Sequence, residues 1–232
     1  MGYNFDLAGV LRGEYLDWFL IGIATTLALT AAAWCLGMVL GVVLALIRMV
    51  PFRPLEWLVA IYVEYHRNVP LLVQVFVWYF GVAQVLPRPA RIWMNNHHGE
   101  FLFAAIALGL CSAAYVSEDL RSGIRSVPRT QYEAARSIGF GYLSAMRWVV
   151  LPQAFRSVVP PLIGQTLLLF KNTSLAMAVG VGELTYRTRE VDSYTFKTFE
   201  AFAVATVVYL LISFAIMGLG SFTARRVKLE VR

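Results

Sequence analysis

The stretch WFLIGIATTLALTAAAWCLGMVLGVVLALI, residues 18–47, decides the fold class. It contains no Asp, Glu, Lys or Arg, and about 20 apolar residues suffice to cross the hydrocarbon core of a bilayer. Small residues recur in it every four positions, a spacing that lets a second helix approach its backbone closely, at Ala33, Gly37, Gly41 and Ala45. The sequence therefore predicts a membrane-spanning helix that packs through a small-residue stripe.

The composition of the whole chain points the same way. Of its 232 residues, 59% are hydrophobic and 15% are charged, whereas soluble domains have about 45–50% apolar and about 25% charged residues. These values exclude an ordinary soluble domain. The formal net charge is +6, but the basic residues form short clusters between apolar runs, which favours membrane topology over nucleic-acid binding.

Further apolar runs complete the expected architecture. They predict an all-α integral membrane protein with a single transmembrane domain over residues 1–232 and about five spans near 18–47, 57–86, 101–120, 148–170 and 199–222. The loop at about 125–147 is the longest amphipathic segment, and a further short helix is expected over residues 173–182. Residues 1–17 lack a basic n-region, so no cleavable signal is expected there.

Lys and Arg set the expected orientation. Cytoplasmic loops carry an excess of these residues. With five spans, one side of the membrane holds eleven of them and the other holds six. The richer side comprises the first turn, the 125–147 loop with its flanks, and the carboxyl-terminal tail, so the amino terminus is expected outside and the carboxyl terminus in the cytoplasm.

Motifs for chemistry on this chain are absent from the sequence. It contains no phosphate-binding loop, no dinucleotide-binding glycine motif and no zinc-protease motif. The adjacent His97 and His98 suit a solvated loop better than a metal site, and Cys35 and Cys111 are interpreted as small buried thiols. We therefore expect no catalytic residue, no metal and no cofactor bound by this chain, which alone is not an enzyme.

The amphipathic loop contains the most informative pattern. Thr130 and Glu133 fit a capping box at the start of a short helix, and Ala134 and Ala135 are strong helix formers. Gly139 stands where a left-handed residue ends a helix. The loop therefore predicts two short cytoplasmic helices that lead into the fourth span.

The spacing in this loop resembles a known family motif. Glu133-Ala134-Ala135, three residues, Gly139, nine residues, Val149, one residue and Leu151-Pro152 resembles the EAA loop of ABC importer permeases, with Val149 in place of isoleucine. Residues 64–74 and 171–175 resemble two further stretches of the polar amino-acid permeases. Residues 67–71, 78–79, 86–87 and 224–229 most resemble the glutamate/aspartate branch.

The resemblance implies a bacterial inner-membrane complex of type I ABC importer architecture. It implies a second permease subunit, homologous or identical, two cytoplasmic ATPase subunits that hold ATP and Mg²⁺, an external substrate-binding protein, an amino-acid substrate and membrane lipid, with no nucleic acid. The ATPase-coupling residues that it implies are Glu133, Ala134, Ala135, Gly139, Leu151 and Pro152. Closure of the ATPases is expected to move the short helices as levers.

Polar residues within the spans are candidates for the substrate path, because an ionisable residue at membrane depth is costly and faces a bundle interior or wet cavity. They are Arg67, Gln74, Lys171, Asn172, Thr173 and Ser174. Pairing of Arg67 with Glu64 on the same helix face is an equal alternative for that arginine. Glu118 and Asp119 are expected to pair with Arg121 or Arg125.

Other functions stay open from the residues alone. Permeases for glutamine, histidine or arginine share most of these patterns, and a channel or membrane scaffold subunit is a competitor from another class. A scaffold would have no use for Arg67 and Lys171 at membrane depth, and a channel would need no ATPase lever.

Overall fold

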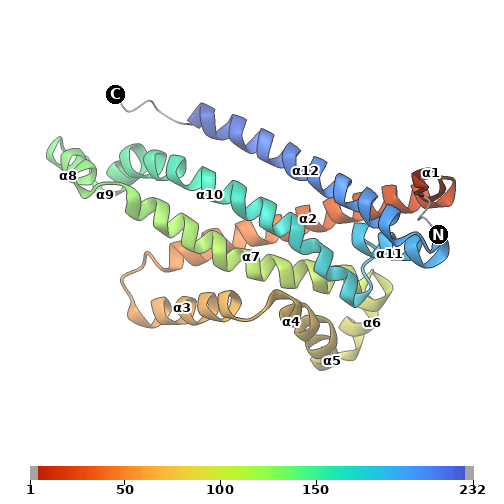
Figure 1. Cartoon of the computed structure of the whole chain (residues 1–232). Helices are drawn as coiled ribbons and strands as arrows, with labels where there is room; N and C mark the ends of the chain where they lie inside the picture. The colour runs from red at the N-terminus through yellow and green to blue at the C-terminus, as the bar shows by residue number, and fades with distance from the viewer. Residues whose placement is uncertain (1–4, 228–232) are drawn as a thin grey trace.

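The computed structural model describes residues 5–227, and these residues form helices and connecting turns without a β-strand. The longest helices run side by side as an elongated bundle (Figure 1). They are α2 (Glu14–Ile47), α7 (Gly99–Ser126), α10 (Leu151–Asn172) and α12 (Thr198–Val227). The all-α prediction is confirmed.

Four helical segments are long and apolar enough to cross a membrane, and a bent pair supplies a fifth crossing if it counts as one span. The four segments are Glu14–Ile47, Gly99–Ser126, Tyr142–Val179 and Thr198–Arg225. The third joins α9 (Tyr142–Ala145), the π-helical η2 (Met146–Val150), α10 and the 3-10 helix η3 (Thr173–Val179).

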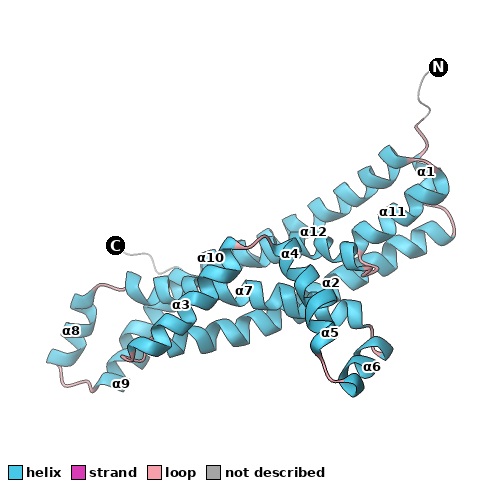
Figure 2. Ribbon diagram, turned by 90° about the horizontal axis from the view of Figure 1, so that it is seen from below, coloured by secondary structure: helices cyan, strands magenta, loops and turns pink. Residues whose placement is uncertain are grey.

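The segment expected as a span at 57–86 is not one continuous helix. The chain there forms α3 (Arg53–Asn68) and a second helical segment, Leu71–Val85, bent by 108° from the first. Pro70 explains the break, because it disfavours helical backbone at Val69, whose φ of −90° and ψ of 130° are extended. The segment after the bend consists of α4 (Leu71–Phe76), the π-helical η1 (Val77–Val82) and α5 (Ala83–Val85), and α5 stands away from the bundle in Figure 2.

The closest packing in the bundle joins α2 to α7. The stripe of small residues on α2 is buried as expected, at Ala33, Gly37, Gly41 and Ala45. A β-carbon added at Gly37 would lie 2.8 Å from Ser112 Oγ, and one at Gly41 would lie 3.2 Å from the carbonyl oxygen of Ala113. Larger side chains at these glycines would force the two helices apart.

The two cysteines differ in burial. Cys35 is exposed on the bundle surface, so the expectation of two buried thiols holds for Cys111 only.

The bundle has two different ends (Figure 1). At one end lie α8 (Arg129–Ser137), α9 and the last turns of α12. At the other end lie α1 (Leu7–Val10), α6 (Arg88–Asn96) and α11 (Leu184–Thr195). The excess of Lys and Arg assigns the α8 end to the cytoplasm. We call the opposite end the outer end.

The short helix expected over residues 173–182 is present but shorter. It is η3, Thr173–Val179, and Gly180 ends it with a left-handed φ of 89°. The amphipathic α11 that follows was not predicted. Its buried Leu184 and Val191 pack with Val10, Phe19 and Ala201, so it closes the outer end of the bundle over α2 and α12.

Candidate functional site

The EAA motif lies on α8, at the cytoplasmic end of the bundle. The helix begins at Arg129 and follows Pro128, and its first turn has no side-chain cap. The expected capping box of Thr130 and Glu133 is therefore wrong. Glu133 instead pairs with Arg129 one turn earlier, at 3.2 Å, and its side chain is 60% exposed. The carboxylate is thus available to a second protein.

Gly139 ends α8 as the sequence predicts. Its φ is 92°, a left-handed backbone that favours glycine. The amide of Gly139 donates to the carbonyl of Arg136 at 3.1 Å, and the amide of Phe140 donates to the carbonyl of Ala135 at 3.1 Å. This pair of bonds is the Schellman pattern, which turns the chain sharply after a helix.

The two alanines of the motif have different surroundings. Ala135 is 3% exposed, and α8 packs against η2. Ala134 is exposed. Large apolar side chains are also exposed at this end, with Ile138 at 74% and Leu143 at 79%. Apolar groups clustered at a water-facing tip are typical of a protein contact surface.

A continuous helical path leads from the loop into the bundle. After the turn at Gly139, α9 runs through η2 into α10, whose first residues are Leu151 and Pro152. The side chains of Gln153 and Gln131 lie 3.5 Å apart and link α10 to α8. Leu151 is exposed and directly follows the π-helical η2, and Pro152 comes next in this path.

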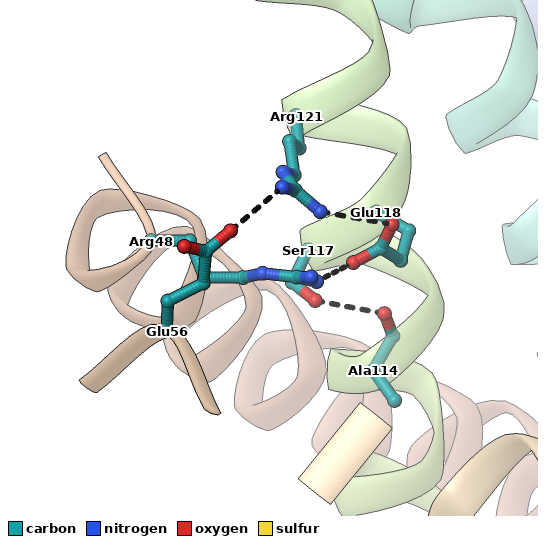
Figure 3. Close-up of polar contacts among 6 residues, drawn as sticks. All are labelled: Arg48, Glu56, Ala114, Ser117, Glu118 and Arg121. Atoms are coloured by element: carbon teal, nitrogen blue, oxygen red, sulfur yellow. Dashed lines mark hydrogen bonds and ion pairs between the residues drawn. The ribbon is translucent and has the colours of Figure 1, made fainter. Parts of the chain in front are cut away.

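Beside this loop, an ion-pair cluster joins three helices, as Figure 3 shows. Arg48, at the end of α2, pairs with Glu118 of α7. Arg121, one turn later on α7, lies 4.0 Å from Glu118 and 3.2 Å from Glu56 of α3. The expected pairing of Glu118 with Arg121 is thus confirmed. Asp119 forms no ion pair within residues 5–227, so that half of the expectation is wrong.

Gln74 holds the break between α3 and α4. It is 1% exposed, and its amide donates to the carbonyls of His66, at 3.1 Å, and Val69, at 2.8 Å. Its carbonyl oxygen lies 2.6 Å from His66 Nδ1. These contacts occupy the amide, so Gln74 has a structural position in this conformation.

Arg67 does not pair with Glu64. Glu64 accepts a hydrogen bond from Asn68 at 2.8 Å, and the Arg67 guanidinium instead lies 5.6 Å from the centre of the Tyr115 ring. A cation over an aromatic face is attracted by the ring quadrupole. Tyr115 lines a small hollow between α4, α7 and α10, so Arg67 stands beside this hollow.

The hollow has a polar wall. Asn172 and Gln165 of α10 face Ser112 and Tyr115 of α7 across it. Its space is about 20 Å³, which holds about one water molecule. The cavity is therefore closed to an amino acid in this conformation.

The other predicted path residues are divided between surface and core. Lys171 is exposed, and Ser174 donates to the carbonyl of Lys171 at 2.8 Å. Thr173 is completely buried and donates to the carbonyl of Phe170 at 2.7 Å. Only Asn172 of this run lines the hollow.

Sequence reasoning missed Gln165, which lines the hollow beside Asn172. The two residues are seven positions apart and so share one face of a helix, a signal that the sequence did contain. It also missed Asp119 of α7, whose buried Oδ2 has no hydrogen-bond partner within residues 5–227. Among the described residues, no cluster of His, Cys, Asp and Glu could hold a metal ion.

Most of the chain is similar in sequence to known proteins. Residues 37–229 match the family model of the binding-protein-dependent transport system inner membrane component. The glutamate/aspartate import permease protein GltJ of Escherichia coli K12 is 35% identical, over 93% of this chain and 89% of its own. The probable glutamine ABC transporter permease protein GlnM of Bacillus subtilis is 39% identical, over 86% of each chain.

A solved structure agrees with the fold. The crystal structure of an amino acid ABC transporter with histidines contains a chain that is 30% identical, with a TM-score of 0.85 over 97% of this chain and all of the other. The family match spans both the EAA helix and the polar hollow. The chain belongs to the family of inner membrane components of binding-protein-dependent transport systems.

Proposed function

We propose that this chain is the permease subunit of an ATP-driven importer of polar amino acids, with glutamate and aspartate as substrates. In the complex it pairs with a second permease subunit, two ATPase subunits that hold ATP and Mg²⁺, and an external binding protein in a bacterial inner membrane. The observation that carries the proposal is α8, a short helix that presents Glu133 and Ala134 outward and joins α10 through a fixed turn.

In this proposal, α8 is the contact that transmits ATPase motion. Glu133 supplies an exposed carboxylate, Ala134 leaves space for close approach, and Ile138 and Leu143 add apolar contact area. Because Ala135 packs inward and Gly139 fixes the exit, a push on α8 moves η2 and α10 with it. Rigid-body motion of this kind is one established route to alternating access.

The substrate path, in the same proposal, uses the hollow between α4, α7 and α10. Movement of α10 opens this closed space, and Asn172 and Gln165 then supply hydrogen bonds. Two exposed basic residues are near this space. Arg67 lies beside it, over the Tyr115 ring, and Lys171 precedes the lining residue Asn172 in the sequence. An arginine can bind a carboxylate through two hydrogen bonds, and an acidic amino acid presents two carboxylates.

Two findings support acidic substrates, namely the similarity to GltJ along most of the chain and the basic Arg67 beside the hollow. A second candidate is a permease for a neutral or basic polar amino acid. The neutral amides of Gln165 and Asn172 favour it, as does the similar protein GlnM, which is named for glutamine. The arginine transport system permease protein ArtQ of Bacillus subtilis, 30% identical over 97% of this chain, favours a basic substrate.

Co-purification and uptake test the two parts of the proposal separately. Glu133→Ala should release the ATPase from the detergent-purified complex, while Glu14→Ala at the outer end should retain it.

Arg67→Met or Lys171→Met should abolish uptake with the ATPase still attached, and Arg91→Met on exposed α6 should transport normally. Normal glutamate uptake by both span variants would contradict carboxylate binding by these residues.

A further inference from the structure

A hollow at the outer end lies away from α8 and from the small polar hollow between α4, α7 and α10. Its space is about 740 Å³, and three segments line it: α2, the connection from α6 to α7, and the turn from η3 into α11. None of the residues assigned to coupling or to the substrate path lines it. The hollow is therefore separate from both of those sites.

Arg187 of α11 forms part of the wall and is held there by packing. A β-carbon at Gly22 of α2 would lie 3.1 Å from Arg187 Cγ, and one at Gly182 would lie 3.2 Å from Arg187 Nη2. Two glycines thus leave the space that the side chain fills. Nη1 donates to Glu190 at 2.6 Å, whereas Nε is buried and has no acceptor in the described part of the chain. Guanidinium donors remain for a ligand oxygen.

The remaining charges of the wall are acidic. Glu190 is already paired with Arg187, and Glu100 at the start of α7 faces the same hollow. His98 Nδ1 lies 3.7 Å from Glu100. The wall has two carboxylates against one guanidinium, a balance that disfavours a purely anionic ligand. A ligand that carries both a negative and a positive group matches this wall.

The third wall is apolar and extends into the membrane. Ile21, Ala24 and Ala28 of α2 line the hollow and are exposed on the protein surface. Ala28 lies about 10 Å further along the helix than Ile21, at a rise of 1.5 Å per residue. Since residues 18–47 carry no charge and belong to a span, this wall lies at hydrocarbon depth. A polar amino acid would gain little from such a wall, whereas an acyl chain would bury apolar surface against it.

We propose that this hollow binds a phospholipid whose headgroup carries an amine, such as a phosphatidylethanolamine. Arg187 holds the phosphate, Glu100 accepts the ammonium group, and one acyl chain lies along Ala24 and Ala28. The bound lipid fills the space between α2 and the turn before α11 and thereby supports the outer end of the bundle.

Native mass spectrometry of the purified importer complex tests the proposal. The complex is mixed with equal amounts of dioleoyl phosphatidylethanolamine and dioleoyl phosphatidylglycerol, and retained lipids are counted. Arg187→Gln should reduce retained phosphatidylethanolamine by at least about tenfold, because a charge-assisted hydrogen bond is lost. Glu100→Gln should shift retention towards phosphatidylglycerol. Ala28→Phe should exclude the acyl chain without touching a charge.

Two matched controls accompany these variants. Arg189→Gln removes an exposed arginine of the same helix that does not line the hollow, and Ala31→Phe enlarges an exposed alanine of α2 outside it. Both should retain the lipid as the unaltered complex does. Unchanged retention in Arg187→Gln and Ala28→Phe, or equal retention of both lipids by the unaltered complex, would overturn the proposal. Displacement of the lipid by free glutamate would assign the hollow to the substrate and would equally contradict it.

Discussion

The ion-pair cluster and the α8 helix lie at the same end of the bundle, but they are held in opposite ways. Arg48, Glu56, Glu118 and Arg121 bind one another and tie α2, α3 and α7 together. On α8, Glu133 and Ala134 face outward, and the helix packs on η2 through its buried Ala135. We call the ion-pair cluster the frame, and in the proposal the exposed groups of α8 form the contact for a partner.

Like the ion-pair cluster, the outer end of the bundle is held together by polar contacts within the chain. Glu183 is completely buried and accepts the amides of Thr185 and Tyr186 and the hydroxyl of Tyr209. Lys197 donates to Asp6 at 2.5 Å. The molecule therefore combines internally paired polar groups with one protruding helix, α8, which we propose to act as the lever, and substitutions in the two parts should fail differently.

The largest effect is expected for Gly139→Val. A β-branched residue tolerates the left-handed backbone at this position poorly, so the turn between α8 and α9 should be lost. Uptake should fall below detection in vesicles, while the protein still inserts and purifies. Gly141→Val is the matched control, because Gly141 has an ordinary φ of −68° and free space around it. Equal uptake by the two variants would disprove the role of the turn.

A smaller effect, on stability, is expected for Glu118→Gln. Arg48 is only 10% exposed, and the loss of its partner carboxylate leaves a poorly solvated charge. We expect the free energy of unfolding to fall by about 2 kcal/mol, measured by thermal denaturation in detergent. Glu56→Gln at a half-exposed pair and Glu133→Gln on the lever should change it by less than about 0.5 kcal/mol. A similar loss in all three would remove the distinction between frame and lever.

A further decrease of about 1–2 kcal/mol is expected for Glu183→Ala, because the first turn of α11 loses its cap. The remaining folded protein should couple ATP hydrolysis to uptake normally. Glu133→Ala should show the converse, normal stability with a detached ATPase. If Glu183→Ala instead released the ATPase and left stability unchanged, the two ends would not differ as described.

The smallest effect is a dependence of stability on pH at the outer end. The Lys197 ammonium and the amide of Gly9 hold the pKa of Asp6 below its ordinary value. A lowered pKa in the folded state means that the stabilisation is present above the ordinary value, near 3.8, and is lost as the pH falls through the folded value. When the melting temperature is plotted against pH, Asp6→Asn should reduce its decrease at acid pH. An unchanged decrease would show that the pair of Asp6 and Lys197 does not stabilise the fold.

The sequence predicts the helix α2 well, because a segment that crosses lipid must be long and uncharged. The uncharged run of residues 18–47 and its small-residue stripe both correspond to observed features of α2. The bend at Pro70 was missed although a proline marked it, since its size depends on contacts between Gln74 and His66 that no local pattern encodes.

The candidate site was predicted less completely. Gly139 could be recognised because a left-handed residue after a short helix strongly favours glycine. Ala134 and Ala135 are identical in type, and only the packing of α8 on η2 separates them. The spacing of Gln165 and Asn172 places both on one helix face, but only the convergence of α4, α7 and α10 shows that this face lines the hollow.

Photo-crosslinking from α8 tests the central claim most directly. A photoreactive amino acid replaces the exposed Ala134 in living cells, with the same substitution at exposed Tyr194 of the outer end as the control. The account predicts a crosslink to the ATPase subunit from position 134 and none from position 194. Absence of the ATPase product from position 134, with the protein correctly inserted, would contradict the account.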